Sequence, residues 1–262
     1  MKFFSPIRIF IGLLILLFLG AIFGLEGWDV ASWGMHLWHL ALIFLGSFAV
    51  SLVLQKFFKF PPANRENRII TTLILFLLFN PFVASPIFLL IGAAAELTQR
   101  LLRTTIGPIF NPAASVAFVF GLAGIHAAWW GSNFAPYLYT ASFTVSLTFF
   151  LIVPVAGYVA YRYRKFPLLA SFLIVFSLMN LLFWERIPVS LFTSSYGTFF
   201  LLIMAIEPKT SPNSPRKQIV YGGILGVALP IFTWLGFIDA ALMALLLGNL
   251  YTAFSVLPRI NK

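Results

Sequence analysis

The stretch "LLIMAIEPKTSPNSPRKQIVYGG" (Leu201–Gly223) joins two strongly apolar segments through a short polar turn. Its first six residues suit the interior of a lipid bilayer, and the chain becomes apolar again from Ile219 onward. Between them stand one glutamate, three prolines and several hydroxyl side chains. Because proline pushes the residue before it out of helical geometry, a helix is expected to end near Glu207. The stretch therefore predicts an apolar helix, a proline- and serine-rich turn, and a second apolar helix.

The composition of the whole chain shows what surrounds such segments. The chain has 262 residues, of which 61% are hydrophobic and only 9% are charged. A soluble domain carries about 25% charged residues, so this chain has too few to cover the surface of a water-soluble fold. It is therefore predicted to be an integral membrane protein. Because the chain contains no cysteine, disulfides, thiolate metal sites, iron–sulfur clusters held by this chain and cysteine nucleophiles are excluded.

Ten apolar segments are candidate membrane helices, since a span needs about 20 residues and fewer where it is interrupted. None shows the regular alternation of a barrel strand. The opening segment also resembles a signal peptide, but its apolar core is long and more apolar segments follow, which favours a first span. The ten segments are residues 7–25, 35–55, 69–82, 86–103, 111–125, 135–161, 166–184, 188–206, 218–236 and 239–257.

Positive charges alternate with these segments along the chain. If the amino terminus is cytoplasmic, all 17 lysines and arginines except Arg186 fall on the cytoplasmic side, as the positive-inside rule requires. The sequence thus predicts ten spans with both termini in the cytoplasm. The net charge of +10 then reports topology, so the lipid bilayer is the expected partner and nucleic acid is not.

Ten spans divide naturally into two halves of five. Because five is odd, the second half would enter the membrane from the opposite side, as in the inverted repeats of many transporters. The dipeptides Asn111-Pro112 and Glu207-Pro208 are a weak internal echo of this kind. The predicted fold is an all-α polytopic membrane protein, a single transmembrane domain over residues 1–262. Its inverted 5+5 repeat, with broken or half helices, would cover residues 7–125 and 135–257.

Asn111 and Pro112 predict the start of a short helix, because asparagine is a strong cap and proline is well tolerated in the first turn. If the chain before them is extended within the membrane, the free N–H groups of this helix point at a cavity, where they bind anionic or polar groups. The alternative is a plain short helix that is capped at the membrane surface.

Glu207 lies in the corresponding place of the second half. Thr210 and Ser211 follow it, and their hydroxyls can hydrogen-bond backbone that has left the helix. The alternative is an ordinary cytoplasmic loop with a solvated glutamate. Upstream, "TSSYGT" (Thr193–Thr198) interrupts the apolar run with small hydroxyl residues, which fits either close helix packing or a polar pocket wall.

Other polar residues of the spans have less specific surroundings. Glu96 stands four residues before Arg100, a spacing that allows an ion pair on one helix, although an ionisable residue within a span is also a candidate for proton or cation movement. His36 and His39 are predicted to belong to an aromatic interface belt and not to a metal site. The external loop "HAAWWGSNFAP" (His126–Pro136) is expected to be an interface anchor or a lid.

Two motifs resemble the RnfD/NqrB family, which comprises membrane subunits of Rnf complexes and of sodium-translocating NADH:quinone oxidoreductases. They are "FNPAASVAFVFG" (Phe110–Gly121) and "GTFFLLIMAIEPKTSP…YGGILG" (Gly197–Gly226). The family's second motif reads Thr-Asp-Pro-x-(Thr/Ser)-Ser-Pro before a glycine-rich span, and Ile206–Pro212 takes that place here. The stretch Phe76–Asn111 follows the family's order as well. The resemblance extends from about Ile69 to the end of the chain.

This resemblance implies a urea-transporter-like fold and a role in flavin-linked electron transport coupled to the movement of Na⁺ or H⁺. It also implies an inner membrane of bacterial type. Family members carry FMN, commonly linked to the threonine of a Ser-Gly-Ala-Thr motif after the fifth span. The corresponding region here has Ser132 and no threonine, so FMN or riboflavin would be held noncovalently. Glu207 keeps the charge of the family's aspartate.

The expected site follows from the helix breaks and the resemblance together. Glu96 and Glu207 are the expected ion-pathway groups, and flavin would lie between the two half-helix starts. Expected partners are subunits of a redox complex or a soluble reductase on the cytoplasmic face. Two alternatives stay open: a channel or transporter for a small polar solute with no redox role, and a membrane anchor for a soluble reductase. The expected cofactor-binding residues are Asn111, Pro112, Gly197, Thr198, Thr210 and Ser211.

Overall fold

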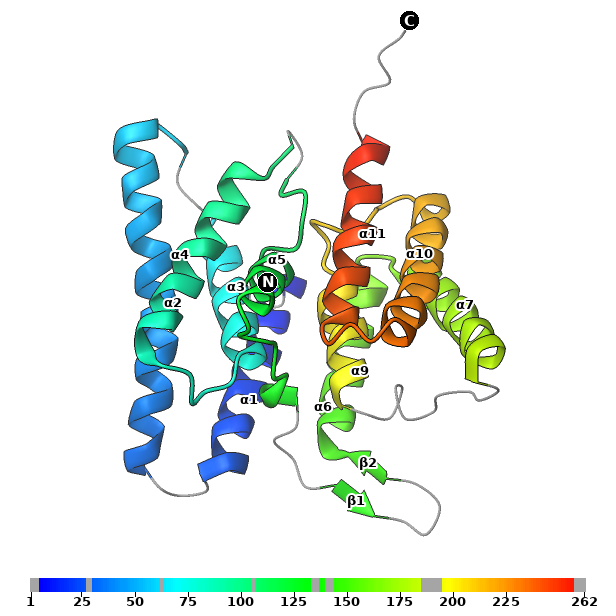
Figure 1. Ribbon diagram of the computed structural model, residues 1–262, viewed down its shortest axis with the longest axis horizontal. Helices are drawn as coiled ribbons and strands as arrows, with labels where there is room; N and C mark the ends of the chain where they lie inside the picture. The colour runs from blue at the N-terminus through cyan, green and yellow to red at the C-terminus, as the bar shows by residue number, and fades with distance from the viewer. Residues whose placement is uncertain are drawn as a thin grey trace, which may run out of the picture.

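The computed structural model describes residues 5–26, 30–61, 64–104, 107–132, 137–139, 144–184 and 195–256. Within these ranges the protein is almost entirely helical, which confirms the predicted all-α class, and one short β-hairpin is added (Figure 1). The elements are α1 (Pro6–Glu26), α2 (Val30–Phe58), α3 (Arg65–Leu78), α4 (Ser85–Leu101), α5 (Pro112–Leu122), η1 (Trp130–Ser132), β1 (Tyr137–Tyr139), β2 (Thr144–Ser146), α6 (Leu147–Arg162), α7 (Phe166–Trp184), α9 (Ser195–Phe199), η2 (Phe200–Ala205), α10 (Pro215–Trp234) and α11 (Ala240–Val256).

Two interruptions of similar sequence divide the helices. The first break (residues 79–84) separates α3 from α4 and contains Asn80-Pro81; the second break (residues 206–214) separates η2 from α10 and contains Glu207-Pro208. In each case a Ser-Pro pair follows at once, and its proline stands in the first turn of the next helix, where proline costs no hydrogen bond. Proline therefore both ends one helix and begins the next at each break.

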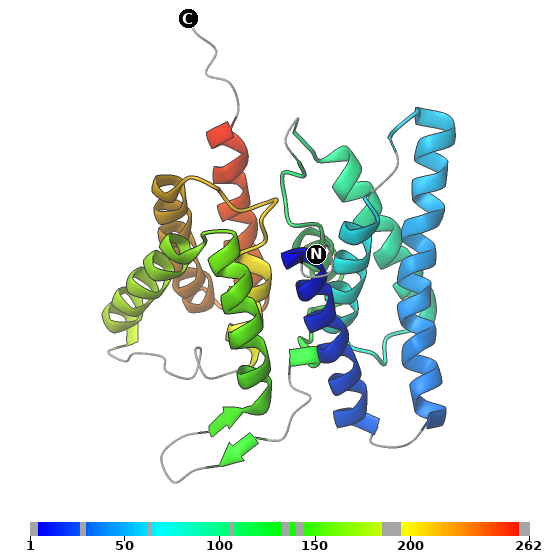
Figure 2. The same ribbon diagram turned by 180° about the vertical axis from the view of Figure 1, so that it is seen from behind.

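The two halves of the chain lie side by side, with α1–α5 in one half and α6–α11 in the other (Figures 1 and 2). Contacts between the halves run mainly through α1 with α6 and through α5 with α11. In Figure 1, α1 runs downward and α6 upward, α2 upward and α7 downward, and α4 upward and α10 downward. Successive helices of the second half thus run opposite to those of the first.

The most extensive helix packing is the same in both halves, namely α2 on α4 and α7 on α10. Glycines bring each pair together. A Cβ atom at Gly92 of α4 would contact the backbone carbonyl of Ile43 in α2, and one at Gly222 of α10 would contact the backbone carbonyl of Leu168 in α7. Such small residues let two helix backbones approach closely.

The centre of the molecule is filled by α3, by α5 and by the first turns of α11. All residues of α3 from Thr71 to Leu78 are buried. In α5 the residues from Pro112 to Ala117 are buried. Helix α5 contacts α11, in which Ala240, Ala241 and Ala244 are buried as well. Small buried side chains are therefore present in both helices where the halves meet.

Each of the ten predicted apolar segments contains a helical element, with one clear difference. The prediction of a helix from residue 135 was wrong, because β1 and β2 form an antiparallel hairpin there and α6 begins only at Leu147. Residues 188–194 of the eighth predicted segment lie outside the described residues, and α9 with η2 forms the rest of it.

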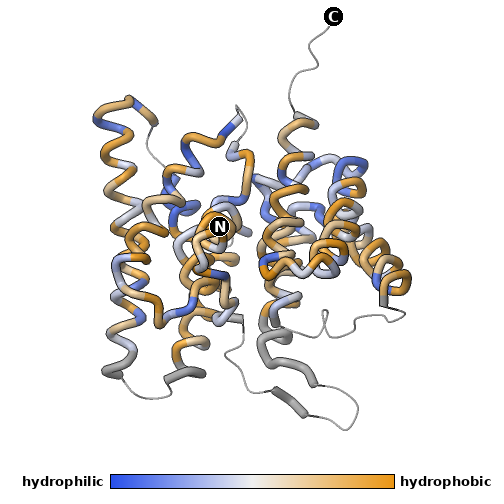
Figure 3. Tube along the Cα trace, viewed as in Figure 1, coloured by the Kyte–Doolittle hydropathy of each residue, from blue (hydrophilic) through white to orange (hydrophobic). Residues whose placement is uncertain are grey.

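Helix length alone gives weak evidence about a membrane. Among the described residues, two helical segments, Trp33–Phe58 and Phe166–Phe183, are long and apolar enough to cross a bilayer by themselves. Four further apolar helices are shorter, at 10–17 residues. Most of the helices in both halves consist largely of hydrophobic residues (Figure 3).

Candidate functional site

The second break brings Glu207 to the end of an irregular helix. The six residues Phe200–Ala205 form a π-helix, a wider winding that is rare and is found frequently at functional sites. The last turn then tightens, because the backbone N–H of Glu207 donates to the carbonyl of Met204. This change of winding places the Glu207 side chain beside the start of α5, in the other half of the chain.

The Glu207 carboxylate is half-buried and accepts two hydrogen bonds on one oxygen. Asn111 Nδ2 donates to Oε2 at 2.8 Å, and Thr210 Oγ1 donates to the same atom at 2.9 Å. Ser211 Oγ donates to the backbone carbonyl of Glu207 at 2.6 Å. The structure therefore brings together four of the residues expected from sequence, and Glu207 is not the fully solvated side chain of an ordinary loop.

Asn111 connects this carboxylate to the helix behind it. Its Oδ1 accepts from the N–H of Ala114 at 3.0 Å, which is the predicted helix cap. Its own backbone N–H donates to Oδ1 of Asn249 in α11 at 2.8 Å. The Asn249 amide in turn donates to the carbonyl of Thr210 at 3.3 Å and to the Tyr221 hydroxyl at 3.0 Å. Asn249, which is fully buried, thus holds both the start of α5 and the second break.

The far side of the second break is held by Lys165 and Gln218, both fully buried. Lys165 Nζ donates to the Pro212 carbonyl at 2.7 Å, and Gln218 Nε2 donates to the same carbonyl at 3.1 Å. Burial lowers the pKa of the Lys165 ammonium to about 8, while the Glu207 carboxylate favours the charged form. The side chain therefore stays mostly protonated at neutral pH.

The same carboxylate faces a small cleft. Glu207 and Lys209 line one wall, and the other walls come from α1, from Asn67 of α3 and from the end of α6 near Tyr163. Most of this lining is apolar, so Glu207 is the described carboxylate on which a small cation or a proton entering the cleft would bind. A carboxylate held by amide and hydroxyl donors in a partly desolvated position suits reversible binding of H⁺ or Na⁺.

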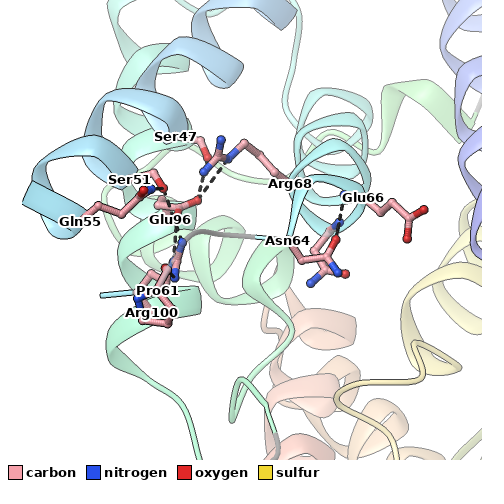
Figure 4. Close-up of polar contacts among 10 residues, drawn as sticks. Ser47, Ser51, Gln55, Pro61, Asn64, Glu66, Arg68, Glu96 and Arg100 are labelled. Carbon is pink, nitrogen blue, oxygen red and sulfur yellow. Dashed lines mark hydrogen bonds and ion pairs between the residues drawn. The ribbon is translucent and has the colours of Figure 1, made fainter. Parts of the chain in front are cut away.

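Glu96 occupies a separate cluster between α2, α3 and α4 (Figure 4). Its Oε1 accepts from Arg100 Nε at 2.9 Å, which confirms the predicted ion pair. Its Oε2 accepts from Ser47 Oγ at 3.0 Å and lies 3.5 Å from Arg68 Nε. Arg100 also donates to the Pro61 carbonyl. With both arginines buried against one carboxylate, the cluster joins three helices.

The histidines lie elsewhere than expected. The prediction that His36 and His39 belong to an interface belt was wrong, because both are buried. The His36 ring stacks on Trp130, and the His39 ring stacks on Phe88 with centroids 4.3 Å apart. His39 Nε2 also lies 2.8 Å from Ser85 Oγ, at the end of the first break. Among the described residues no group of three or more His, Asp or Glu side chains is placed to hold a metal ion.

Gly197 and Thr198 do not join the Glu207 site. They lie in α9, ten and nine residues before Glu207, and the π-helix Phe200–Ala205 stands between. Their neighbour Tyr196 packs edge-on against Trp129, with ring centroids 4.7 Å apart. Since Trp129 belongs to the loop after α5, this contact agrees with the packing interpretation of the "TSSYGT" stretch, while the interface-anchor or lid role of the loop stays a prediction.

The expected flavin does not fit between the two helix starts. Asn111 and Thr210 meet on the same oxygen of Glu207, and Ser211 is bound to the backbone of the break. An isoalloxazine ring placed there would have to break all three hydrogen bonds. These residues therefore form a closed polar contact and not a cofactor pocket.

Sequence reasoning missed four residues that complete the site. Each had a signal, since a polar or ionisable side chain within or beside an apolar span is rare and usually has a partner. Asn249, for example, interrupts the apolar run "ALLLGNLYTAF". The missed residues are Lys165, Gln218, Tyr221 and Asn249.

The sequence was also compared with known proteins. A scan against models of protein families finds no match for the chain, and a search of curated proteins finds none either.

Proposed function

We propose that the protein is a multi-pass membrane protein whose Glu207 carboxylate binds a proton or a sodium ion during ion movement. The membrane assignment is supported by the surface of α2. Large apolar side chains are exposed along most of its length, among them Leu37, Leu45 and Leu52, each about half exposed. A soluble protein rarely exposes apolar patches of such extent, whereas lipid covers them at no cost.

The orientation is supported by the charges at one end of the helices. The end of α2, the end of α4, the α6–α7 turn and the second break lie at the same end of the molecule in Figure 1. They carry Lys56, Lys59, Arg103, Arg162 and Arg164 among other cations. By the positive-inside rule this is the cytoplasmic end. The first break then faces the opposite side.

The inverted repeat is supported by matched packing and matched breaks. The pairs α2–α4 and α7–α10 meet through glycines, and the helix after each break begins with Ser-Pro. The remaining helices also correspond, with α5 matching α11, so the repeat pairs Asn111-Pro112 with the start of α11 and not with Glu207-Pro208 as the sequence echo indicated. Asn111 precedes α5 and contacts the other half, and Asp239 precedes α11 and contacts His126 of the other half at 2.8 Å. In transporters with inverted repeats, coupling-ion sites lie where the two repeats meet.

Within this architecture the function that the site supports best is that of an RnfD/NqrB-like subunit, in which ion movement is coupled to electron transport by partner proteins. The single observation that carries it is the Glu207 carboxylate, held by Asn111 across the boundary between the halves. This contact joins the Glu-Pro-x-Thr-Ser-Pro motif to the Phe-Asn-Pro-Ala motif, and these are the two motifs on which the resemblance rests. No step of the proposal requires flavin on this chain. A solute channel is less well supported, because the residues of α5 from Pro112 to Ala117 are buried.

The proposal predicts that Glu207→Gln removes ion binding without unfolding the protein. Glutamine keeps the size of the side chain and an oxygen for the Asn111 and Thr210 donors, but it loses the negative charge. The measurement is the thermal unfolding midpoint of purified protein in sodium chloride and in choline chloride at equal ionic strength, repeated over a pH series. The wild-type protein should be stabilised by sodium or by protonation, and the variant should lose that response.

The matched control is Glu66→Gln, since Glu66 is an exposed carboxylate 3.8 Å from Arg8 at the start of α3. It should respond to sodium and pH as the wild-type protein does. If Glu207→Gln keeps the full response of the wild-type protein to both, ion binding at Glu207 is refuted.

A further inference from the structure

The second break contains a second polar feature, on the side away from Glu207. The Lys165 side chain is fully buried between α6 and α7. Its Nζ lies 2.7 Å from the Pro212 carbonyl, 3.2 Å from the Ser211 carbonyl and 3.2 Å from Asn213 Oδ1. No ion pair of the described residues includes Lys165. All three of its hydrogen bonds therefore go to neutral oxygens, and the Glu207 carboxylate acts on its charge only from a distance.

The turn that carries these three oxygens is also held by groups other than Lys165. Gln218 Nε2 donates to the carbonyls of Pro212 and Asn213 at 3.1 and 3.4 Å, and Asn249 holds the Thr210 carbonyl just before them. The turn is thus fixed from two sides by neutral amides. Unwound backbone with its carbonyls gathered in this way coordinates monovalent cations in transporters with broken helices.

We propose that the oxygens of Ser211, Pro212 and Asn213 form a monovalent-cation site, and that the Lys165 ammonium is its permanent occupant. The lysine takes the place of a dissociable ion and keeps the second break closed. The site shares no atom with the Glu207 carboxylate, so this inference does not depend on ion binding by Glu207.

The distances indicate which free ions would replace the lysine. The oxygens lie 2.7–3.2 Å from Nζ, farther than the roughly 2.0–2.6 Å that magnesium and calcium require. The site also offers no negative charge. Ammonium and potassium therefore suit it, whereas divalent ions and bulky choline do not.

The test removes the tethered ion and supplies a free one. Lys165→Ala empties the site, and Lys165→Met removes the same charge but fills the space with an apolar side chain. We expect both variants to unfold at a lower temperature than the wild-type protein in choline chloride. Ammonium chloride or potassium chloride at equal ionic strength should restore at least half of the lost midpoint in Lys165→Ala and none of it in Lys165→Met.

Two controls separate this effect from others. Lys217→Ala removes a lysine that donates to a single carbonyl, that of Ser255, and should gain no dependence on these salts. Lys165→Ala combined with Glu207→Gln should still be rescued by ammonium, which separates this site from the one at Glu207. The proposal is overturned if ammonium and potassium leave Lys165→Ala unchanged. The proposal also expects cellular potassium to stabilise Lys165→Ala but not Lys165→Met. It is therefore equally overturned if Lys165→Met accumulates in potassium-rich cells and Lys165→Ala does not.

Discussion

We expect Gly222→Ala to destabilise the protein by about 3 kcal/mol, the upper part of the range for overpacking a tight contact. A Cβ atom at this position would meet the Leu168 carbonyl directly, and it would lie 3.0 Å from the Phe172 backbone nitrogen. Backbone atoms cannot rotate away, so α7 and α10 would have to separate along their length. The measurement is the unfolding midpoint of the purified variant in detergent, together with its accumulation in membranes.

The adjacent glycine supplies the control for this prediction. A Cβ atom at Gly223 would meet only the Ser171 hydroxyl, at an ordinary distance of 3.7 Å. Because alanine favours a helix over glycine by up to about 1 kcal/mol, Gly223→Ala should be neutral or stabilising. Equal stability of Gly222→Ala and Gly223→Ala would show that the two helices do not approach as described.

Glu96→Gln should cost about 3–5 kcal/mol, the usual penalty for removing one partner of a buried ion pair. The carboxylate is 1% exposed, and it faces Arg100 and Arg68, which are 4% and 10% exposed. Without its charge, two buried guanidinium groups would repel each other between α2, α3 and α4 (Figure 4). The variant should therefore show a large fall in unfolding midpoint, and adding Arg100→Leu should recover part of the loss.

The same variant distinguishes the two interpretations of Glu96. A structural ion pair predicts a loss of stability, while the response to sodium and pH persists in the folded fraction. An ion-pathway residue predicts normal stability and a lost ion response. Normal stability with a lost ion response would support the interpretation of Glu96 as an ion-pathway residue, together with Glu207.

Much of the fold was predictable because apolar helices reveal themselves by composition. The ten apolar segments each contain a helical element, and the helix start at Asn111 followed from the preference of asparagine and proline for that position. The hairpin β1–β2 was not predictable in the same way. Its sequence, "YLYTASFTVS", carries no charge and runs directly into the apolar residues of α6, so the absence of charge did not separate a strand pair from a helix there.

The sequence predicted that Glu207 belongs to the site, but it did not predict the residues from other helices that hold the second break. Glu207 and Thr210 stand together in a motif, so their contact is local in sequence. Asn249 and Lys165 come from helices packed against the break, and only the tertiary structure brings them within hydrogen-bond distance. The prediction of an interface belt was wrong for a related reason. The spacing of His36 and His39 is the same whether that helix surface faces lipid or packs on Trp130.

In the proposed architecture, two helix–turn–helix connections of opposite orientation place their turns, the first and second breaks, on opposite faces of a membrane. Because the chain has no cysteine, single substitutions can be labelled cleanly with a membrane-impermeant thiol reagent. Phe82→Cys lies in the first break, and Asn213→Cys lies in the second; both positions are exposed. With Asn64→Cys as a reference for the cytoplasmic side, we expect Asn213→Cys to label with Asn64→Cys, and Phe82→Cys to label only from the outside. Labelling of the two breaks from the same side, or of Asn64→Cys and Asn213→Cys from opposite sides, would contradict the account.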